Sequence, residues 1–122
     1  MARLVVDGMN VIGSTPDGWW RDRDGAVRRL AVRLQERARG TGDDVTLVLD
    51  GRPLPDLAEG DHDGVHVHYA RRSGRDAADD RIVELVRDDT DPSSITVVTS
   101  DRGLASRVQE LGATVVGARS LL

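Results

Sequence analysis

LVVDGMN, residues 4–10, is the stretch that decides how this chain folds. Three consecutive apolar residues end on Asp7, and Gly8 follows, which is typical of a strand buried on both faces that stops at a turn. Asp7 then has two interpretations. It is either an ordinary strand-ending residue or a carboxylate held at the end of the strand for chemistry.

Similar apolar runs recur along the chain, and helical patterns lie between them. Strands are predicted at 3–6, 45–49, 65–69, 95–99 and 114–116. Helices are predicted at 24–38, 76–89 and 101–111, where apolar residues are spaced three and four apart. The segment 51–64 is rich in Gly, Pro and Asp and is interpreted as a loop. This alternation predicts a parallel α/β sheet, and the length favours a single domain over residues 1–122.

The composition narrows the class of protein. There is no cysteine, which excludes a disulfide framework and a thiolate metal site. The net charge is −4 and all 17 basic residues are arginine, so a polyanionic partner has to be met by a local arginine cluster or by metal ions. No apolar run is long enough for a signal peptide or a membrane span, which favours a cytoplasmic protein without membrane contact.

Six aspartates gather where predicted strands end and helices begin. They are Asp7, Asp50, Asp76, Asp79, Asp80 and Asp101. Because ligands of parallel α/β sheets bind beyond the carboxyl ends of the strands, these acids can converge on one rim. Each also has a structural explanation, as a turn residue, a helix cap or a first-turn acid. Together they favour a site for a hard cation, since oxygen ligands select Mg²⁺ or Mn²⁺.

Five segments in register resemble the NYN-domain ribonucleases of the PIN-like superfamily, most closely their YacP-like branch. The segments are LVVDGMNVIG (4–13), VTLVLDG (45–51), RDAADDRIVELV (75–86), ITVVTSDRGLA (95–105) and GATVVGARSLL (112–122). The resemblance implies a three-layer α/β/α, PIN-like (Rossmann-like) domain. Its five-stranded parallel sheet would have the order 3-2-1-4-5, with the first and fourth predicted strands side by side. Two features depart from the family: Met9 replaces a usual aromatic residue, and the chain ends where family members often continue.

The resemblance also implies roles for individual residues. The implied catalytic residues are Asp7, Asn10, Asp76, Asp79 and Asp101. The implied metal ligands are Asp7, Asp79 and Asp101, with Asp50 and Asp80 as further candidates. Asn10 would orient a ligand, a water molecule or Asp7, and Asp50 would lie beside Asp7 on the second strand.

Contacts to RNA are predicted from the basic residues near the acids. The dense basic segment HYARRSGR, residues 68–75, precedes the acidic helix. The candidate RNA-binding residues are Arg71, Arg72, Arg75, Ser100 and Arg102. A solvated loop is the alternative for the arginines. Of Trp19 and Trp20, at least one is expected to pack in the core, although indoles also stack on bases.

Other classes fit less well. A haloacid-dehalogenase-type phosphatase needs a second Asp at the position of Met9, and a receiver domain needs a late Lys, which the chain lacks. Zinc at His62, His66 and His68 is disfavoured because another ligand would be needed. The sequence therefore predicts a metal-dependent endoribonuclease that uses Mg²⁺ or Mn²⁺ and acts on RNA. A non-catalytic RNA-binding module on the same fold is the alternative, and a homodimer is possible in either case.

Overall fold

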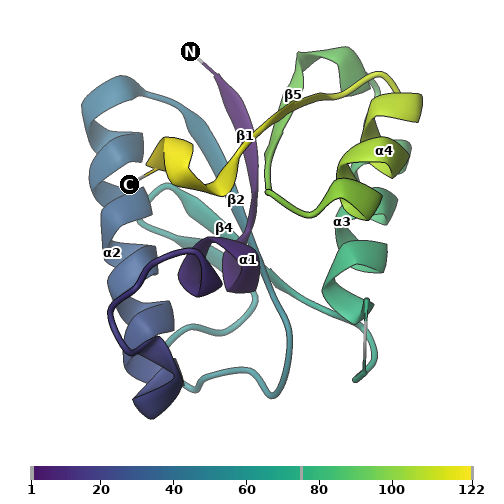
Figure 1. Cartoon of the computed structure of the whole chain (residues 1–122). Coiled ribbons are helices and arrows are strands. Elements are labelled where there is room, and N and C mark those ends of the chain that lie inside the picture. Colours follow the sequence, from purple (N-terminus) through teal and green to yellow (C-terminus); the bar gives the residue numbers. More distant parts are fainter. Residues whose placement is uncertain (1, 75, 122) are drawn as a thin grey trace.

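A six-stranded sheet forms the centre of the molecule in the computed structural model, which describes residues 2–74 and 76–121 (Figure 1). Its strands are β1 (Arg3–Asp7), β2 (Asp44–Leu49), β3 (Gly60–His62), β4 (Val65–Tyr69), β5 (Ile95–Val98) and β6 (Thr114–Val116). Their order is β3-β4-β2-β1-β5-β6, and all neighbours are parallel except β3 and β4. The five parallel strands confirm the predicted order 3-2-1-4-5.

The edge strand β3 corrects one prediction, because it lies in the segment 51–64 that was interpreted as a loop. It pairs antiparallel with β4 and places Asp61 opposite His66. The two residues between these strands, Asp63 and Gly64, both have positive φ, as tight hairpin turns with primed geometry require. The strand is short and polar and packs little apolar surface, so its sequence carries no alternating apolar pattern.

Helices cover both faces of the sheet, as Figure 1 shows. The helices α1 (Gly8–Gly13) and α2 (Arg23–Thr41) lie on one face, and α3 (Ala77–Asp88) and α4 (Arg102–Glu110) lie on the other. Short helical turns are η1 (Trp19–Arg21), η2 (Pro92–Ser94) and η3 (Ala118–Leu121). The three-layer architecture and the three predicted helices are confirmed, whereas α1 was not predicted. Within the described residues, no helix combines the length and apolar content that a membrane span requires.

Alternate side chains of β1 fill two separate cores. Leu4 and Val6 pack with α2 on one face, and Val5 packs with α3 and α4 on the other. All three are at most 6% exposed. A strand buried on both faces has to be apolar at every position, which explains the continuous run before Asp7.

The central position of β1 brings the site together. It pairs with β2 on one side, where Asp7 lies opposite Val48, and with β5 on the other, where Val6 lies opposite Val98. The chain therefore turns away from the sheet at Asp7, Asp50 and Thr99 along one edge. This is where the strand order reverses, the usual place for a ligand in an open α/β sheet.

Candidate active site

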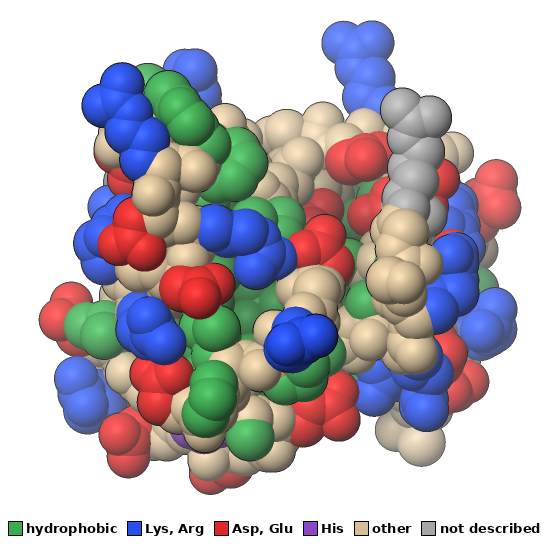
Figure 2. All heavy atoms as spheres, turned by 90° about the horizontal axis from the view of Figure 1, so that it is seen from below, with side chains coloured by type: hydrophobic (Ala, Val, Ile, Leu, Met, Phe, Trp, Pro, Cys, Tyr) green, Lys and Arg blue, Asp and Glu red, His purple; other side chains and the backbone are tan. Residues whose placement is uncertain are grey.

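An acidic cleft of about 270 Å³ lies at the carboxyl ends of β1, β2 and β5. It is lined by Asp7, Met9, Asn10, Asp50, Asp76, Ala77, Ala78, Asp79 and Asp101. Figure 2 looks at the molecule from below, the side on which these strands end, and shows acidic side chains in and around a hollowed surface. Five of the six aspartates predicted to converge do line one cleft.

Asp7 is the most buried of these acids, with 4% of its surface exposed. Its Oδ2 accepts a 2.8 Å hydrogen bond from the hydroxyl of Thr99, which is itself 2% exposed. Burial raises the pKa of the Asp7 carboxyl, and the nearby charges of Asp101 and Asp50 raise it further, while the Thr99 hydrogen bond opposes them. Asp7 is therefore held rigidly in a position where its negative charge is costly.

Gly8 allows α1 to begin directly after Asp7. A Cβ atom at this position would lie 2.7 Å from Cδ2 of Leu49 and 2.9 Å from both Cδ1 of Leu47 and the carbonyl oxygen of Val48. Only a residue without a side chain lets the first turn of α1 approach β2 so closely. Gly8 is thus required by packing and not by a positive φ.

Asn10 and Thr99 join the elements around the cleft. The side-chain oxygen of Asn10 accepts a 2.8 Å hydrogen bond from the backbone N–H of Ser100, which fixes α1 against the loop between β5 and α4. The hydroxyl oxygen of Thr99 accepts from the N–H of Asp101 at 3.1 Å. Thr99 therefore contacts both Asp7 and the backbone of Asp101, a role that the sequence did not reveal.

Asp101 is the N-cap of α4 as well as a lining residue of the cleft. Its Oδ1 accepts a 3.0 Å hydrogen bond from the N–H of Leu104. The structural explanation considered for Asp101 is therefore correct, but it uses only one of the two carboxylate oxygens. The hydroxyl of Ser100, its neighbour, accepts from the N–H of Ala118 at 2.9 Å, so it anchors the C-terminal segment and is not the cap.

Asp76 and Asp79 enter the cleft from the start of α3. Asp76 precedes the helix with φ of 63°, a left-handed conformation that Asp tolerates better than most residues, and its side chain makes no capping hydrogen bond. Asp79 is half-buried, and its pKa is raised to about 6 because of burial and then the charges of Asp7, Asp101 and Asp76. The carboxylates thus affect one another across the cleft.

The structure separates Asp50 and Asp80 from this group. Asp50 lines the cleft, but its Oδ1 binds the guanidinium of Arg23 at 2.6 Å. Asp80 does not line it, and its carboxylate binds Arg72 and, at 3.0 Å, Arg107, which lower its pKa. Both acids are paired with cations of the chain. These contacts do not support Asp80 as a metal ligand, and Arg23 is a site residue that the sequence did not indicate.

Three of the predicted RNA-binding arginines, Arg71, Arg72 and Arg102, do not line the acidic cleft. Arg71 binds Glu84 at 2.7 Å and Arg72 binds Asp80, so both are paired with acids of α3. Arg102 is exposed at the start of α4, beside Asp101. Arg75 falls outside the described residues.

The donor chemistry of the cleft fits a hard cation, although the acids are not gathered around one point. In residues 2–74 and 76–121, no three His, Asp or Glu side chains are close enough to hold one ion. Among the described residues, the ionisable side chains that line the cleft are all aspartates, and the amide of Asn10 lies beside them. Such a set of oxygens suits Mg²⁺ or Mn²⁺ and not zinc, and a cation would relieve the repulsion that raises the pKa of Asp79.

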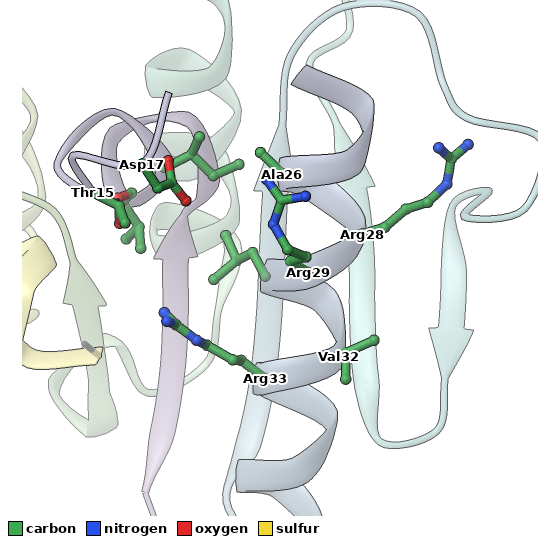
Figure 3. A pocket seen from close by; sticks show the side chains of 10 residues that line it. Thr15, Asp17, Ala26, Arg28, Arg29, Val32 and Arg33 are labelled. Atoms are coloured by element: carbon green, nitrogen blue, oxygen red, sulfur yellow. The ribbon is translucent and has the colours of Figure 1, made fainter. Parts of the chain in front are cut away.

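A larger cleft of about 420 Å³ lies on the other side of α1, between that helix and α2. In Figure 3, Arg29 and Arg33 extend from α2 toward α1 and β1, whereas Arg28 points away. Thr15 and Asp17 face α2 from the opposite wall. The lining is mainly apolar and includes none of the predicted site residues. We therefore do not assign catalysis to this cleft, although it is larger than the acidic cleft.

Comparison with protein families identifies the family of the chain. A model of the YacP-like NYN domain matches residues 4–122. The chain belongs to the YacP-like NYN family. This is a ribonuclease family with a PIN-like fold, so the predicted resemblance is confirmed.

Solved structures of YacP-like proteins support the same assignment. A point mutant of Rae1 (YacP) from Bacillus subtilis matches with a TM-score of 0.77 and 27% identity, over 99% of this chain and 72% of that one. Another structure, of Rae1 (YacP) without a stated mutation, matches with a TM-score of 0.75 and 28% identity, over 99% of this chain and 71% of that one. A comparison with curated proteins found no match.

Proposed function

We propose that this chain is a metal-dependent endoribonuclease that hydrolyses RNA phosphodiester bonds in the acidic cleft. The observation that carries the proposal is that Asp7, Asp79 and Asp101 line one cleft at the carboxyl ends of the central strands. Burial, and then the charges of neighbouring aspartates, raises the pKa of Asp7 and of Asp79. Carboxylates placed together at a cost to their own charged forms are typical of functional sites. The cation that such oxygens favour is Mg²⁺ or Mn²⁺.

Each acid has a distinct part in this proposal. Asp7 would bind the cation with the oxygen that does not accept from Thr99, and Asp101 with the oxygen that does not cap α4. Asp79, at the start of α3, would be the third ligand and would bind in its ionised form. A bound cation would activate water for attack on phosphorus and stabilise the leaving oxygen.

The remaining polar residues of the edge would hold RNA and the acids in place. Asn10 keeps the Ser100 loop against α1 through its 2.8 Å hydrogen bond, and Thr99 fixes the orientation of Asp7. Arg102, exposed next to Asp101, is positioned to neutralise a phosphate of the substrate. The Ser100 hydroxyl oxygen accepts from the N–H of Ala118, so its O–H group can still donate to a phosphate oxygen.

Metal-dependent cleavage of unstructured RNA tests the proposal. We expect the wild-type chain to cleave labelled RNA with Mg²⁺ or Mn²⁺, to lose activity in EDTA, and to regain it when the cation is restored. Asp7→Asn should abolish cleavage, whereas Asp88→Asn, a change of the same kind at an exposed position near the end of α3, should not. Wild-type RNA binding without cleavage under every cation tested would favour the non-catalytic RNA-binding module instead.

A further inference from the structure

Trp20 is an exposed indole in a chain with very few aromatic residues. The sequence contains two Trp, one Tyr and no Phe. Tyr69 is buried and Trp19 packs against the core beside α2, whereas Trp20 is 63% exposed. Core packing therefore accounts for Trp19 and Tyr69 but not for Trp20. Single exposed apolar residues are common, so the surroundings of Trp20 must decide its role.

The turn that carries Trp20 is at the same edge of the sheet as the acidic cleft. Figure 1 shows that α2, which follows this turn directly, starts at the lower end of the sheet, the end at which β1 runs into α1. Arg23, three residues later, donates from Nη2 to both the carbonyl oxygen and Oδ1 of Asp50, at 3.0 and 2.6 Å. Asp50 lines the cleft. Trp20 does not itself line the cleft, but it lies three residues before Arg23, the residue that joins the start of α2 to Asp50, and therefore on the α2 side of the cleft.

The geometry around Trp20 combines an aromatic surface with a cation. The guanidinium carbon of Arg21 is 5.8 Å from the centroid of the Trp20 ring. Arg21 forms no ion pair with any of the described residues. The ring of Trp19 meets that of Trp20 at 87° with 6.3 Å between centroids, which supports the exposed indole from behind. An indole beside an unpaired guanidinium matches the base and the phosphate of one nucleotide.

We infer that Trp20 and Arg21 bind one nucleotide of single-stranded RNA beside the acidic cleft, with the base stacked on the indole and the phosphate held by Arg21. This inference rests on the proposed RNA substrate and extends it to a binding subsite. The subsite lies on the α2 side, across the cleft from Arg72 and Arg107 of the α3 side. An RNA strand bound at this subsite would pass over Asp50 and Arg23 before it reaches the acidic cleft.

Binding to a short unstructured oligoribonucleotide in EDTA tests the inference without any cleavage. We expect Trp20→Ala to weaken binding by between about fivefold and about 150-fold, the range of base–aromatic stacking, and Trp20→Phe to retain most of the affinity. Arg21→Ala should weaken binding less and reduce its dependence on salt. Val32→Ala is the matched control, because Val32 is the other large exposed apolar residue among those the structure describes, at 50%, and lies in the middle of α2.

An oligonucleotide of the same length without bases identifies the contact as stacking. Wild type should bind it about as weakly as Trp20→Ala binds the normal oligonucleotide, and Trp20→Ala should cause no further loss, because both changes remove the same interaction. Thermal unfolding of Trp20→Ala should match wild type, since the side chain is exposed. Unchanged RNA affinity of Trp20→Ala would overturn the inference, and so would an equal loss with both oligonucleotides.

Other outcomes separate this inference from the proposed function. If Trp20→Ala alters the oligomeric state in sedimentation and leaves RNA affinity unchanged, Trp20 is a protein contact and the inference is wrong. If wild type binds RNA through Trp20 but never cleaves it, the subsite stands and the proposed catalytic function fails. If wild type cleaves RNA and Trp20→Ala cleaves and binds equally well, the catalytic function stands and the subsite fails.

Discussion

The hydroxyl of Thr99 donates a 2.8 Å hydrogen bond to Oδ2 of Asp7, although the two residues are 92 positions apart in the chain. Both side chains are nearly inaccessible to solvent. The contact exists because β1 and β5 are parallel neighbours whose carboxyl ends meet at the reversal of strand order. It ties the most buried carboxylate of the cleft to the loop that carries Asp101.

Thr99→Val tests this contact with little change of side-chain shape. A buried acid that loses its hydrogen-bond partner costs about 1–3 kcal/mol, so we expect the free energy of unfolding to fall by that amount. The N–H of Asp101 loses its acceptor in the same variant. RNA cleavage should fall well beyond the loss of folded protein, because Asp7 and Asp101 are no longer fixed relative to one another. Denaturant unfolding and cleavage rates at a temperature where the variant is folded measure both effects.

Thr99→Ser provides the control, since it keeps the hydroxyl and removes a methyl group. It should restore most of the cleavage that Thr99→Val loses. Equal activity of the Val and Ser variants would show that the hydrogen bond does not position Asp7.

Gly8→Ala should disturb the start of α1. The added Cβ atom would meet Leu49, Leu47 and the Val48 carbonyl at 2.7–2.9 Å, and overpacking of this kind costs about 1–3 kcal/mol. Because α1 carries Asn10, its displacement should also reduce cleavage. Gly40→Ala is the comparison: Gly40 lies in α2 with nothing within 4 Å of the added atom, so this change should be neutral or slightly stabilising. Equal unfolding midpoints for the two variants would contradict the packing assigned to Gly8.

Asp79→Asn should stabilise the metal-free protein at neutral pH. The pKa of Asp79 is raised to about 6 in the folded state, above the ordinary value of about 3.9 expected in the unfolded chain. Between about pH 4 and about pH 6 the folded state keeps a proton that the unfolded chain has released, so this group makes stability fall as pH rises. The Asn side chain does not titrate. The stability advantage of Asp79→Asn should therefore grow across this window and level off above it, as denaturant unfolding at a series of pH values would show.

Divalent cations should reverse the stability advantage of Asp79→Asn over wild type. In the proposed function, Mg²⁺ or Mn²⁺ would bind only the folded site and neutralise the acids, so it should raise the melting temperature of wild type more than that of Asp79→Asn. Asp88→Asn should respond like wild type. Equal shifts in all three proteins would place the cation elsewhere.

Patterns within single elements were enough to predict most of the fold. Apolar runs located the five parallel strands, and apolar spacing located α2, α3 and α4 close to their observed bounds. The strand β3 was not predicted because its three residues bury little apolar surface, although Asp63-Gly64 is a favourable hairpin pair. The helix α1 was not predicted because its six residues depend on the close approach of Gly8 to β2, which is a tertiary contact.

The sequence could predict that acids at the ends of parallel strands lie at one edge of the sheet. It could not predict which of these acids face the cleft. Asp79 and Asp80 are consecutive and equally acidic, but neighbouring helical positions point about 100° apart, as the 3.6-residue turn requires. One faces the cleft, and the other faces Arg72 and Arg107. Likewise, the pairing of Asp50 with Arg23 joins residues 27 positions apart. Such partners depend on tertiary packing, which no local pattern encodes.

Asp101→Asn separates catalysis from RNA binding. The amide oxygen of Asn can still accept from the N–H of Leu104, because Asn is as good an N-cap as Asp, so α4 and the fold should persist. The change removes one negative charge from the cleft. If Asp101 helps to hold a catalytic cation, cleavage of single-stranded RNA should fall by orders of magnitude. RNA affinity measured in EDTA should stay the same or increase, since less negative charge faces the phosphates. Activity of Asp101→Asn close to wild type, with both inhibited by EDTA, would remove Asp101 from the metal site. Activity that survives both the substitution and EDTA would contradict metal-dependent cleavage altogether.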